Sequence, residues 1–313
     1  MQPPLDTARA APTLGLAFGG GGMRGWAHVG VLAVLEELGL VPDVLAGCSA
    51  GSVIAAHLAR GFSPAEIRQL MQEQNTRGLF SFRFDGQGLL STKAFRDYLH
   101  THLGDVTFDE LDRPLYVSAT DLETGKEVVL RSGPVVDAVM ASCAMPGIFA
   151  PVEHGGRQLV DGGLTNNVPV APLVTHGATF TVAVQTFRRL ARPLPGELHE
   201  EAHLEEEVAS VDQQVGLATW AGRLRERVFG GEDRGPNAFE VMQRAVEILM
   251  TQLEAYRLQS YRPDVLIQPE VPGVGPLAFA EEKARIFQAG ADAAWAHADA
   301  LRRLAAALNG PEG

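Results

Sequence analysis

Cysteine is nearly absent from this sequence of 313 residues, which contains only Cys48 and Cys143. Two cysteines are too few for a disulfide-rich scaffold, and neither has the closely spaced Cys or His companions of a zinc site. We therefore expect both thiols to be reduced, and the sequence predicts neither a metal centre nor a cofactor.

Long hydrophobic runs are also lacking. No apolar stretch approaches the roughly 18 residues that a membrane-spanning helix needs, and residues 1–12 lack the apolar segment of a signal peptide. Residues 1–12 are rich in Pro and Ala without periodicity, which is typical of a disordered arm. Together these absences predict a cytoplasmic protein.

Positive charge is scarce, because the chain carries 26 Lys and Arg against 38 Asp and Glu, a formal net charge of −12. Nucleic-acid binding depends on clustered basic side chains that contact phosphates, so this balance argues against a nucleic-acid partner. It also gives the chain no general attraction to anionic lipid. Any contact with a membrane surface is therefore expected to be transient, local and largely apolar.

Apolar residues are plentiful, at 46% of the chain, which is enough for one large core. Predicted strands and helices alternate through residues 13–185, which we interpret as the catalytic core. Helices and a strand at 238–313 are expected to complete the same domain. Within them, 281–308 is predicted to form one closing helix, or a helix pair that breaks around Gly290.

Residues 186–237 are predicted to be a charged insertion that could act as a lid. Glutamates are frequent between 194 and 207, which indicates a solvated helix face or a mobile segment. The stretch 215–229 could be a lid or a membrane-contacting helix, although ordinary surface packing is the favoured interpretation.

The stretch Gly47-Cys48-Ser49-Ala50-Gly51 lies between an apolar run at 41–46 and a helical pattern at 52–60. This strand-turn-helix setting is that of a nucleophile elbow, in which flanking glycines allow a sharp, strained turn. Ser49 would then expose its hydroxyl at the start of a helix, where unpaired N–H groups and the dipole favour an oxyanion. The alternative is a glycine-rich turn with an incidental serine, because this motif also occurs by chance.

A second glycine-rich stretch, Gly20-Gly21-Gly22-Met23-Arg24-Gly25, follows a predicted strand at 14–18 and precedes a helical pattern at 26–38. Strand, glycine loop and helix in this order are typical of an anion site. The stretch also fits the dinucleotide motif Gly-x-Gly-x-x-Gly, but that site needs an acidic residue at the end of the next strand. The next strand leads instead into the elbow, so we expect loop N–H groups, those of Gly21 and Gly22 first, to bind an oxyanion formed at Ser49.

Asp161-Gly162-Gly163 follows a short predicted strand at 157–160. An acidic side chain there faces the carboxyl edge of the sheet, where α/β proteins bind ligands, although an Asp-Gly turn without function is more common. Four histidines follow Asp161, and none lies in an obvious glycine-bounded loop: His176, His199, His203 and His297. We therefore favour a direct Ser49–Asp161 dyad over a triad, and burial must then raise the basicity of the carboxylate.

In their order and spacing, the two glycine stretches, the loop Ala141-Ser142-x-Ala144-x-Pro146-Gly147 and Asp161–Gly163 resemble the patatin-like phospholipase family. Its bacterial members are similar to the catalytic part of neuropathy target esterase. The resemblance implies an α/β fold, a three-layer α/β/α sandwich with a mostly parallel central sheet. It also implies that Ser49 is the nucleophile, that Asp161 accepts its proton without a histidine, and that Gly20–Gly25 form the oxyanion hole.

The implied activity is that of a serine acyl hydrolase that cleaves lipid acyl esters, phospholipid or lysophospholipid, through an acyl-enzyme. A pocket for the acyl chain is expected to draw on Leu79, Phe80, Phe82, Met145, Ile148 and Phe149. For the first three of these, core packing is the favoured alternative. Two other classes of function stay open: a nucleotide-binding protein that uses Gly20–Gly25, and a catalytically silent acyl-binding or interaction protein.

Overall fold

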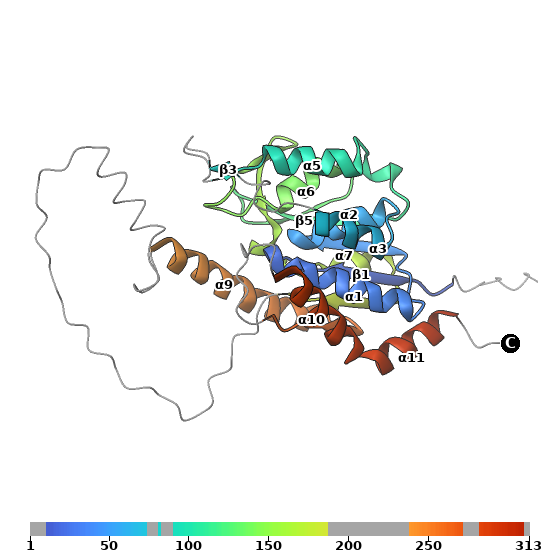
Figure 1. Ribbon diagram of the computed structural model, residues 1–313. Coiled ribbons are helices and arrows are strands. Elements are labelled where there is room, and N and C mark those ends of the chain that lie inside the picture. The colour runs from blue at the N-terminus through green and yellow to red at the C-terminus, as the bar shows by residue number, and fades with distance from the viewer. Residues whose placement is uncertain (1–10, 74–80, 83–89, 187–237, 272–281, 310–313) are drawn as a thin grey trace, which may run out of the picture. The chain divides into compact units, whose positions relative to one another are not determined.

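The computed structural model describes residues 11–73, 81–82, 90–186, 238–271 and 282–309 (Figure 1). By its contacts the chain divides into two units, Met1–Arg188 with Met250–Gly313, and Arg189–Leu249. The larger unit contains the elements discussed below, apart from the helical residues 238–249. Across the described residues, no helix combines the length and the hydropathy that crossing a membrane requires.

The larger unit is built on a mixed sheet with the strand order β10-β9-β1-β2-β5-β8-β7, in which β6 also pairs with β5. Pairing is parallel from β10 to β5 and antiparallel where β6, β7 and β8 join. The strands are β1 (Leu14–Phe18), β2 (Val44–Cys48), β5 (Leu115–Asp121), β6 (Glu127–Leu130), β7 (Val152–His154), β8 (Arg157–Asp161), β9 (Phe180–Val184) and β10 (Val265–Ile267). A separate two-stranded sheet pairs β3 (Ser81–Phe82) with β4 (Leu90–Ser91).

Helices occupy most of the remaining described chain. They are α1 (Trp26–Glu37), α2 (Ala50–Ala59), α3 (Pro64–Glu73), α5 (Lys93–Leu103), α6 (Val135–Ser142), α7 (Val170–His176), α9 (Ala238–Ser260), α10 (Lys283–Trp295) and α11 (Ala298–Asn309). Three short 3-10 helices are η1 (Gly22–Gly25), η2 (Phe108–Glu110) and η3 (Gly162–Leu164).

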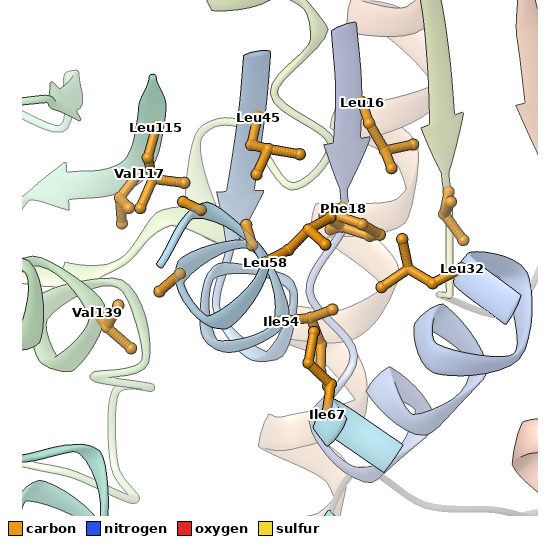
Figure 2. Close-up of a cluster of buried hydrophobic side chains, with 14 of the residues drawn as sticks. Leu16, Phe18, Leu32, Leu45, Ile54, Leu58, Ile67, Leu115, Val117 and Val139 are labelled. Atoms are coloured by element: carbon orange, nitrogen blue, oxygen red, sulfur yellow. The ribbon is translucent and has the colours of Figure 1, made fainter. Parts of the chain in front are cut away.

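Alternation along the strands gives the sheet two different faces, because successive side chains point to opposite sides. On one face Leu16 and Phe18 of β1, Leu45 of β2 and Val117 of β5 join a large cluster with α1, α2, α3 and α6 (Figure 2). On the other face Ala17, Val44 and Ala183 pack with residues of α7 and with Leu258 of α9. Helices on both sides of a mostly parallel sheet confirm the predicted α/β/α sandwich.

The expected closing segment is a pair of helices, α10 and α11, but the break lies at 296–297 and the prediction of a break at Gly290 is wrong. Gly290 lies inside α10, where α10 crosses α1. A Cβ on Gly290 would come within 2.0 Å of the Ala27 carbonyl oxygen, and one on Gly30 of α1 within 2.0 Å of the Phe287 carbonyl oxygen. The glycine therefore permits a close helix crossing rather than ending a helix.

Candidate active site

The pairing around β5 brings the ends of β2 and β8 together. Val117 and Ser118 pair with both β2 and β6, and Ala119 and Thr120 pair with both β6 and β8. Strands β2 and β8 must therefore lie end to end on the same edge of β5, opposite β6. Cys48 pairs with Ser118, and Asp161 pairs with Ala119, the residue that follows Ser118 in β5. One peptide unit of β5 thus separates the last residue of β2 from the last residue of β8.

Ser49 stands at the turn between β2 and α2 in a strained conformation. Its φ of 49° and ψ of −125° make it the one non-glycine residue with positive φ in the described part of the chain. Close packing explains the glycines beside it, since a Cβ on Gly51 would lie 2.3 Å from the Phe18 carbonyl oxygen and one on Gly47 2.6 Å from Ser52 Cα. With Cys48 ending β2 and Ala50 beginning α2, the geometry is that of the predicted elbow.

Asp161 is fully buried at the end of β8, where its Oδ1 accepts hydrogen bonds from the Gly163 N–H at 2.8 Å and the Cys48 thiol at 3.9 Å. Burial raises the pKa of Asp161 to about 6, while hydrogen bonds from Gly163, Ser49 and Cys48 act in the opposite direction. A carboxylate with this pKa is a stronger base than an exposed aspartate and is still largely ionised at neutral pH.

The loop Gly20–Gly25 lies directly beside the elbow. A Cβ on Gly20 would lie 3.0 Å from Ser49 Cβ, and one on Gly25 would lie 2.8 Å from Ala50 Cβ. Met23 and Arg24 continue the loop into η1, and Arg24 is buried. The two glycine stretches predicted to act together thus pack against each other, and a Cβ at either contact would require the neighbouring residues to shift.

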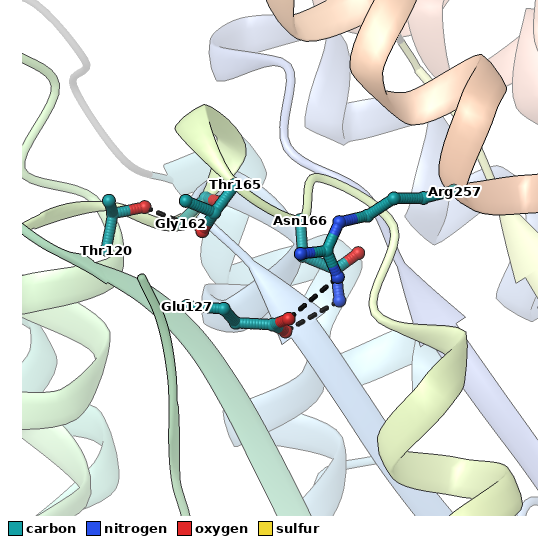
Figure 3. A network of polar contacts seen from close by, with 6 residues as sticks. All are labelled: Thr120, Glu127, Gly162, Thr165, Asn166 and Arg257. Atoms are coloured by element: carbon teal, nitrogen blue, oxygen red, sulfur yellow. Dashed lines mark hydrogen bonds and ion pairs between the residues drawn. The ribbon is translucent and has the colours of Figure 1, made fainter. Parts of the chain in front are cut away.

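The turn after β8 is held by polar contacts to its neighbours (Figure 3). The Thr120 and Thr165 hydroxyls are 2.9 Å apart, and Thr120 also donates to the Asp161 carbonyl oxygen at 2.9 Å. The Glu127 carboxylate accepts from Asn166 Nδ2 at 2.6 Å and from Arg257 Nη1 of α9 at 2.8 Å. Gly162 and Gly163 lie within this turn, where Gly162 packs on the Ser118 carbonyl group and Gly163 on Met250 of α9.

Two positions at the end of α6 and just beyond it support both predicted catalytic residues, a role that the sequence analysis did not assign to them. The Ser142 hydroxyl accepts from the Ser49 N–H at 2.8 Å and donates to the Ser118 carbonyl oxygen at 2.6 Å. The Ala144 carbonyl oxygen accepts from the Asp161 N–H at 2.9 Å. The small residues of this motif were visible in the sequence, but their hydrogen-bond partners, which lie in other elements, were not.

The histidines that follow Asp161 are engaged elsewhere where the structure describes them. His176 Nδ1 lies 2.7 Å from the Tyr116 hydroxyl, and His297 Nδ1 lies 2.9 Å from the Ala293 carbonyl oxygen. His199 and His203 lie outside the described residues. His28 is buried under the glycine loop with Nε2 2.7 Å from the Gly19 carbonyl oxygen, and burial lowers its pKa to about 4, so it is neutral.

The predicted acyl pocket is described only in part. Ile148 is buried, whereas Met145 and Phe149 are half-buried in the turn after α6. Leu79 and Phe80 lie outside the described residues, and only the backbone of Phe82, in β3, is described. Both cysteines are free, and burial raises the pKa of each thiol.

Comparisons with known protein sequences agree on one family. The family model "Patatin-like phospholipase" matches residues 16–174. An NTE family protein of Mycobacterium tuberculosis is 35% identical over 177 residues, which cover 56% of this chain and 49% of that protein. Neuropathy target esterase of Drosophila melanogaster is 27% identical over 180 residues, covering 55% of this chain and 13% of the enzyme. The chain spans about half the length of the mycobacterial relatives.

Among solved structures, VipD from Legionella pneumophila has the same fold. The two structures align with a TM-score of 0.54 over 92% of this chain and 67% of VipD, at 15% sequence identity. At this identity the likeness concerns the arrangement of helices and strands.

Proposed function

Because the chain belongs to the patatin-like phospholipase family, we propose that it hydrolyses acyl esters of lipids, with Ser49 as nucleophile and Asp161 as its general base. The observation that carries this proposal is the end-to-end arrangement of β2 and β8 on one edge of β5. It places a strained, glycine-flanked serine beside a buried carboxylate of raised pKa. No other pair of nucleophile and base in the described residues combines these properties.

The reaction proceeds in two halves that share the same groups. In the first, Ser49 Oγ attacks the acyl carbonyl carbon while Asp161 takes the hydroxyl proton, and loop N–H groups of Gly21 and Gly22 bind the oxyanion. The bond from carbon to the leaving oxygen then breaks, and Asp161 returns the proton to the departing alcohol. In the second half, water attacks the acyl-Ser49 ester, Asp161 takes the water proton, and the proton passes to Ser49 as the fatty acid leaves.

The substrate class we propose is phospholipid or lysophospholipid. A relative from Cryptococcus neoformans, 28% identical over 201 residues, bears the name lysophospholipase. Apolar side chains after α6, Met145, Ile148 and Phe149, would line an acyl site together with Leu79, Phe80 and Phe82. Since such substrates reside in bilayers, the proposal includes transient contact with a membrane surface.

Turnover of a panel of nitrophenyl esters and defined phospholipids tests the proposal, with wild type beside Ser49→Ala and Asp161→Asn. We expect both variants to lose at least about a thousandfold in kcat, because each removes a group that takes part in bond making. A fluorophosphonate probe should label wild type and leave Ser49→Ala unlabelled. His28→Asn is the matched control, and it should keep its labelling if the chemistry needs no histidine.

Two results would overturn the proposal. One is wild-type turnover by Ser49→Ala or Asp161→Asn. The other is absence of both hydrolysis and labelling in wild type together with a thermal shift caused by NAD or ATP, which would favour nucleotide binding at Gly20–Gly25.

A further inference from the structure

Hydrogen bonds fix Gly20 of the oxyanion loop at both its N–H and its carbonyl group. Its N–H donates to both oxygens of Asn167, at 3.1 Å to Oδ1 and at 3.3 Å to the main-chain oxygen. Its carbonyl oxygen accepts from the Thr186 hydroxyl at 2.6 Å. In a trans peptide the C=O of one residue and the N–H of the next point in opposite directions. Fixing the Gly20 carbonyl towards Thr186 therefore directs the Gly21 N–H away from Thr186, and Gly21 is a proposed oxyanion donor.

The amide of Asn167 can hold Gly20 only in one of its two orientations. Rotated by half a turn, the side chain would present its NH₂ group to the Gly20 N–H, a donor facing a donor. An acceptor on the far side of the amide selects the productive orientation. Glu254 is that acceptor, because its Oε2 lies 2.9 Å from Asn167 Nδ2.

Glu254 is an unusual residue for its place in α9. Met250 packs on Gly163, and Leu258 packs on the small-residue face of the sheet. Residues four apart lie on the same helix face, so position 254 belongs to the buried stripe, where an apolar side chain is expected. Glu254 is only 2% exposed. A buried carboxyl group costs stability, and a costly polar group beside a site is the kind of local exception that function explains.

The surroundings of Glu254 leave it largely uncharged at neutral pH. Burial raises the pKa of Glu254 to about 8, although hydrogen bonds from the side chains of Asn167 and Gln185 oppose the rise. A neutral carboxyl group still accepts through its carbonyl oxygen. Arg257, one turn further along α9, forms its ion pair with Glu127 and not with Glu254 (Figure 3).

We propose that Glu254 is a positioning residue: it orients the Asn167 amide, which holds the Gly20 N–H and thereby keeps the oxyanion loop in its working conformation. The proposal rests on the proposed function and adds to it a residue some two hundred positions from Ser49, on a helix outside the region that the family model matches.

Two variants of Glu254 separate its hydrogen bond from its charge and size. Glu254→Gln keeps an oxygen acceptor for Asn167, and we expect it to retain kcat within about twofold of wild type. Glu254→Leu has similar volume and no acceptor, and we expect kcat to fall at least about tenfold with KM unchanged. That loss is a fraction of the hundredfold or more that follows removal of a whole oxyanion donor.

A thionoester substrate, compared with the matching oxoester, gives a kcat ratio that a general loss of stability would not change. Sulfur accepts hydrogen bonds poorly, so a misplaced oxyanion loop slows the oxoester more than the matching thionoester. The oxoester-to-thionoester ratio of kcat should fall in Glu254→Leu and stay at the wild-type value in Glu254→Gln. Leu258→Ala removes an apolar contact of the same helix and keeps both partners of the Glu254–Asn167 hydrogen bond, so it should lower thermal stability and leave the ratio unchanged.

Amide hydrogen exchange tests the same proposal without relying on catalysis. The peptide that contains Gly20 should exchange at least about tenfold faster in Glu254→Leu than in Glu254→Gln, because the Gly20 N–H loses the side-chain half of its hold on Asn167. Unchanged exchange and an unchanged kcat ratio in Glu254→Leu would overturn the positioning role. Turnover by Ser49→Ala would instead overturn the proposed function, so the two failures are distinguishable.

Discussion

At the scale of single residues, burial does most to make Asp161 suitable as a base. An exposed aspartate is too weakly basic to compete well for a serine proton, whereas the buried group has a pKa of about 6. The hydrogen bonds from Gly163 and Cys48 limit this rise, so the carboxylate remains mostly ionised at pH 7. For the proposed role as base, this pKa balances base strength against the fraction of Asp161 that is ionised and able to accept a proton.

The pH dependence of hydrolysis should follow this group. Asp161 must be ionised to accept a proton, so kcat/KM is expected to fall tenfold per pH unit below about 6 and to level off above it. The measurement is kcat/KM for a nitrophenyl ester from pH 4.5 to 8. A flat profile down to pH 5, in a protein shown by circular dichroism to stay folded, would contradict the assignment of Asp161 as the base.

The same pKa predicts a stability effect. The folded-state pKa of Asp161, about 6, lies above its ordinary value of 3.8. The folded chain therefore binds this proton more tightly than the unfolded chain does, and the ionised group destabilises the fold as pH rises through 6. Asp161→Asn should therefore be more stable than wild type by about 2–3 kcal/mol at pH 7.5, with the gain vanishing near pH 4. Urea unfolding at both pH values measures it, and an equal difference at both would contradict the explanation.

Ser49, Asp161 and the glycine stretches could be predicted as site residues from the sequence because each carries a local signature. The sequence alone did not identify Ser142, Asn167 or Glu254 as part of the site. Their partners lie far along the chain, at 93 positions for Ser142 and Ser49 and 87 for Glu254 and Asn167. A glutamate within an apolar helical stripe was the one signal for Glu254 in the sequence, and it has meaning only once the helix face is known.

At the scale of elements, the sequence predicted most helices and strands but not how β8 pairs. The predicted strand at 157–160 was compatible with parallel pairing, since hydrophobic alternation does not record strand direction. The antiparallel pairing with β5 decides the site, because it brings the last residue of β8 to the end of β2. Strand β7 (Val152–His154) was not predicted, because a segment of three residues gives too short a pattern.

The crossing of α1 and α10 allows a test in which two physical effects have opposite signs. Helix propensity alone predicts that Gly290→Ala stabilises the folded protein by about 1 kcal/mol. The close approach of the new Cβ to the Ala27 carbonyl oxygen should instead destabilise it by about 1–3 kcal/mol or more. We expect the steric effect to dominate, since a gap of 2.0 Å to backbone cannot be relieved by a side-chain rotation.

Chemical denaturation of Gly290→Ala measures the net effect, and Ala284→Gly at an exposed position of α10 is the matched control for propensity alone. A Gly290→Ala variant more stable than wild type would show that the two helices can separate at little cost.

At the scale of the whole molecule, the family resemblance covered the first half of the chain, and the structure shows what the second half contributes to it. Strand β10 extends the sheet beyond β9, α10 packs along α1, and α9 from Met250 onward reaches Gly163 and Asn167. The sequence predicted these helices from their periodicity. It could not predict their docking sites, because amphipathic helices show which face is buried and not against what.

A chain that ends at residue 188 should therefore fail to fold cooperatively, although it contains every predicted catalytic residue. It would expose the face of α1 that carries Trp26 and Ala27, which pack with Ile286 of α10, and it would leave β9 as an unpaired edge. Thermal melting followed by circular dichroism, together with fluorophosphonate labelling, checks this. A sharp melting transition with retained labelling would show that the later elements are dispensable.

The end-to-end arrangement of β2 and β8 has a consequence for how such a site can diversify. Spacing between the proposed nucleophile and base follows from the main-chain pairing of β2 and β8 along β5, so it does not depend on the loops that surround the two residues. Lineages could exchange whole substrate-facing segments while the reacting pair stays in register. A catalytic scaffold of this kind separates the chemistry it performs from the molecules on which it performs it.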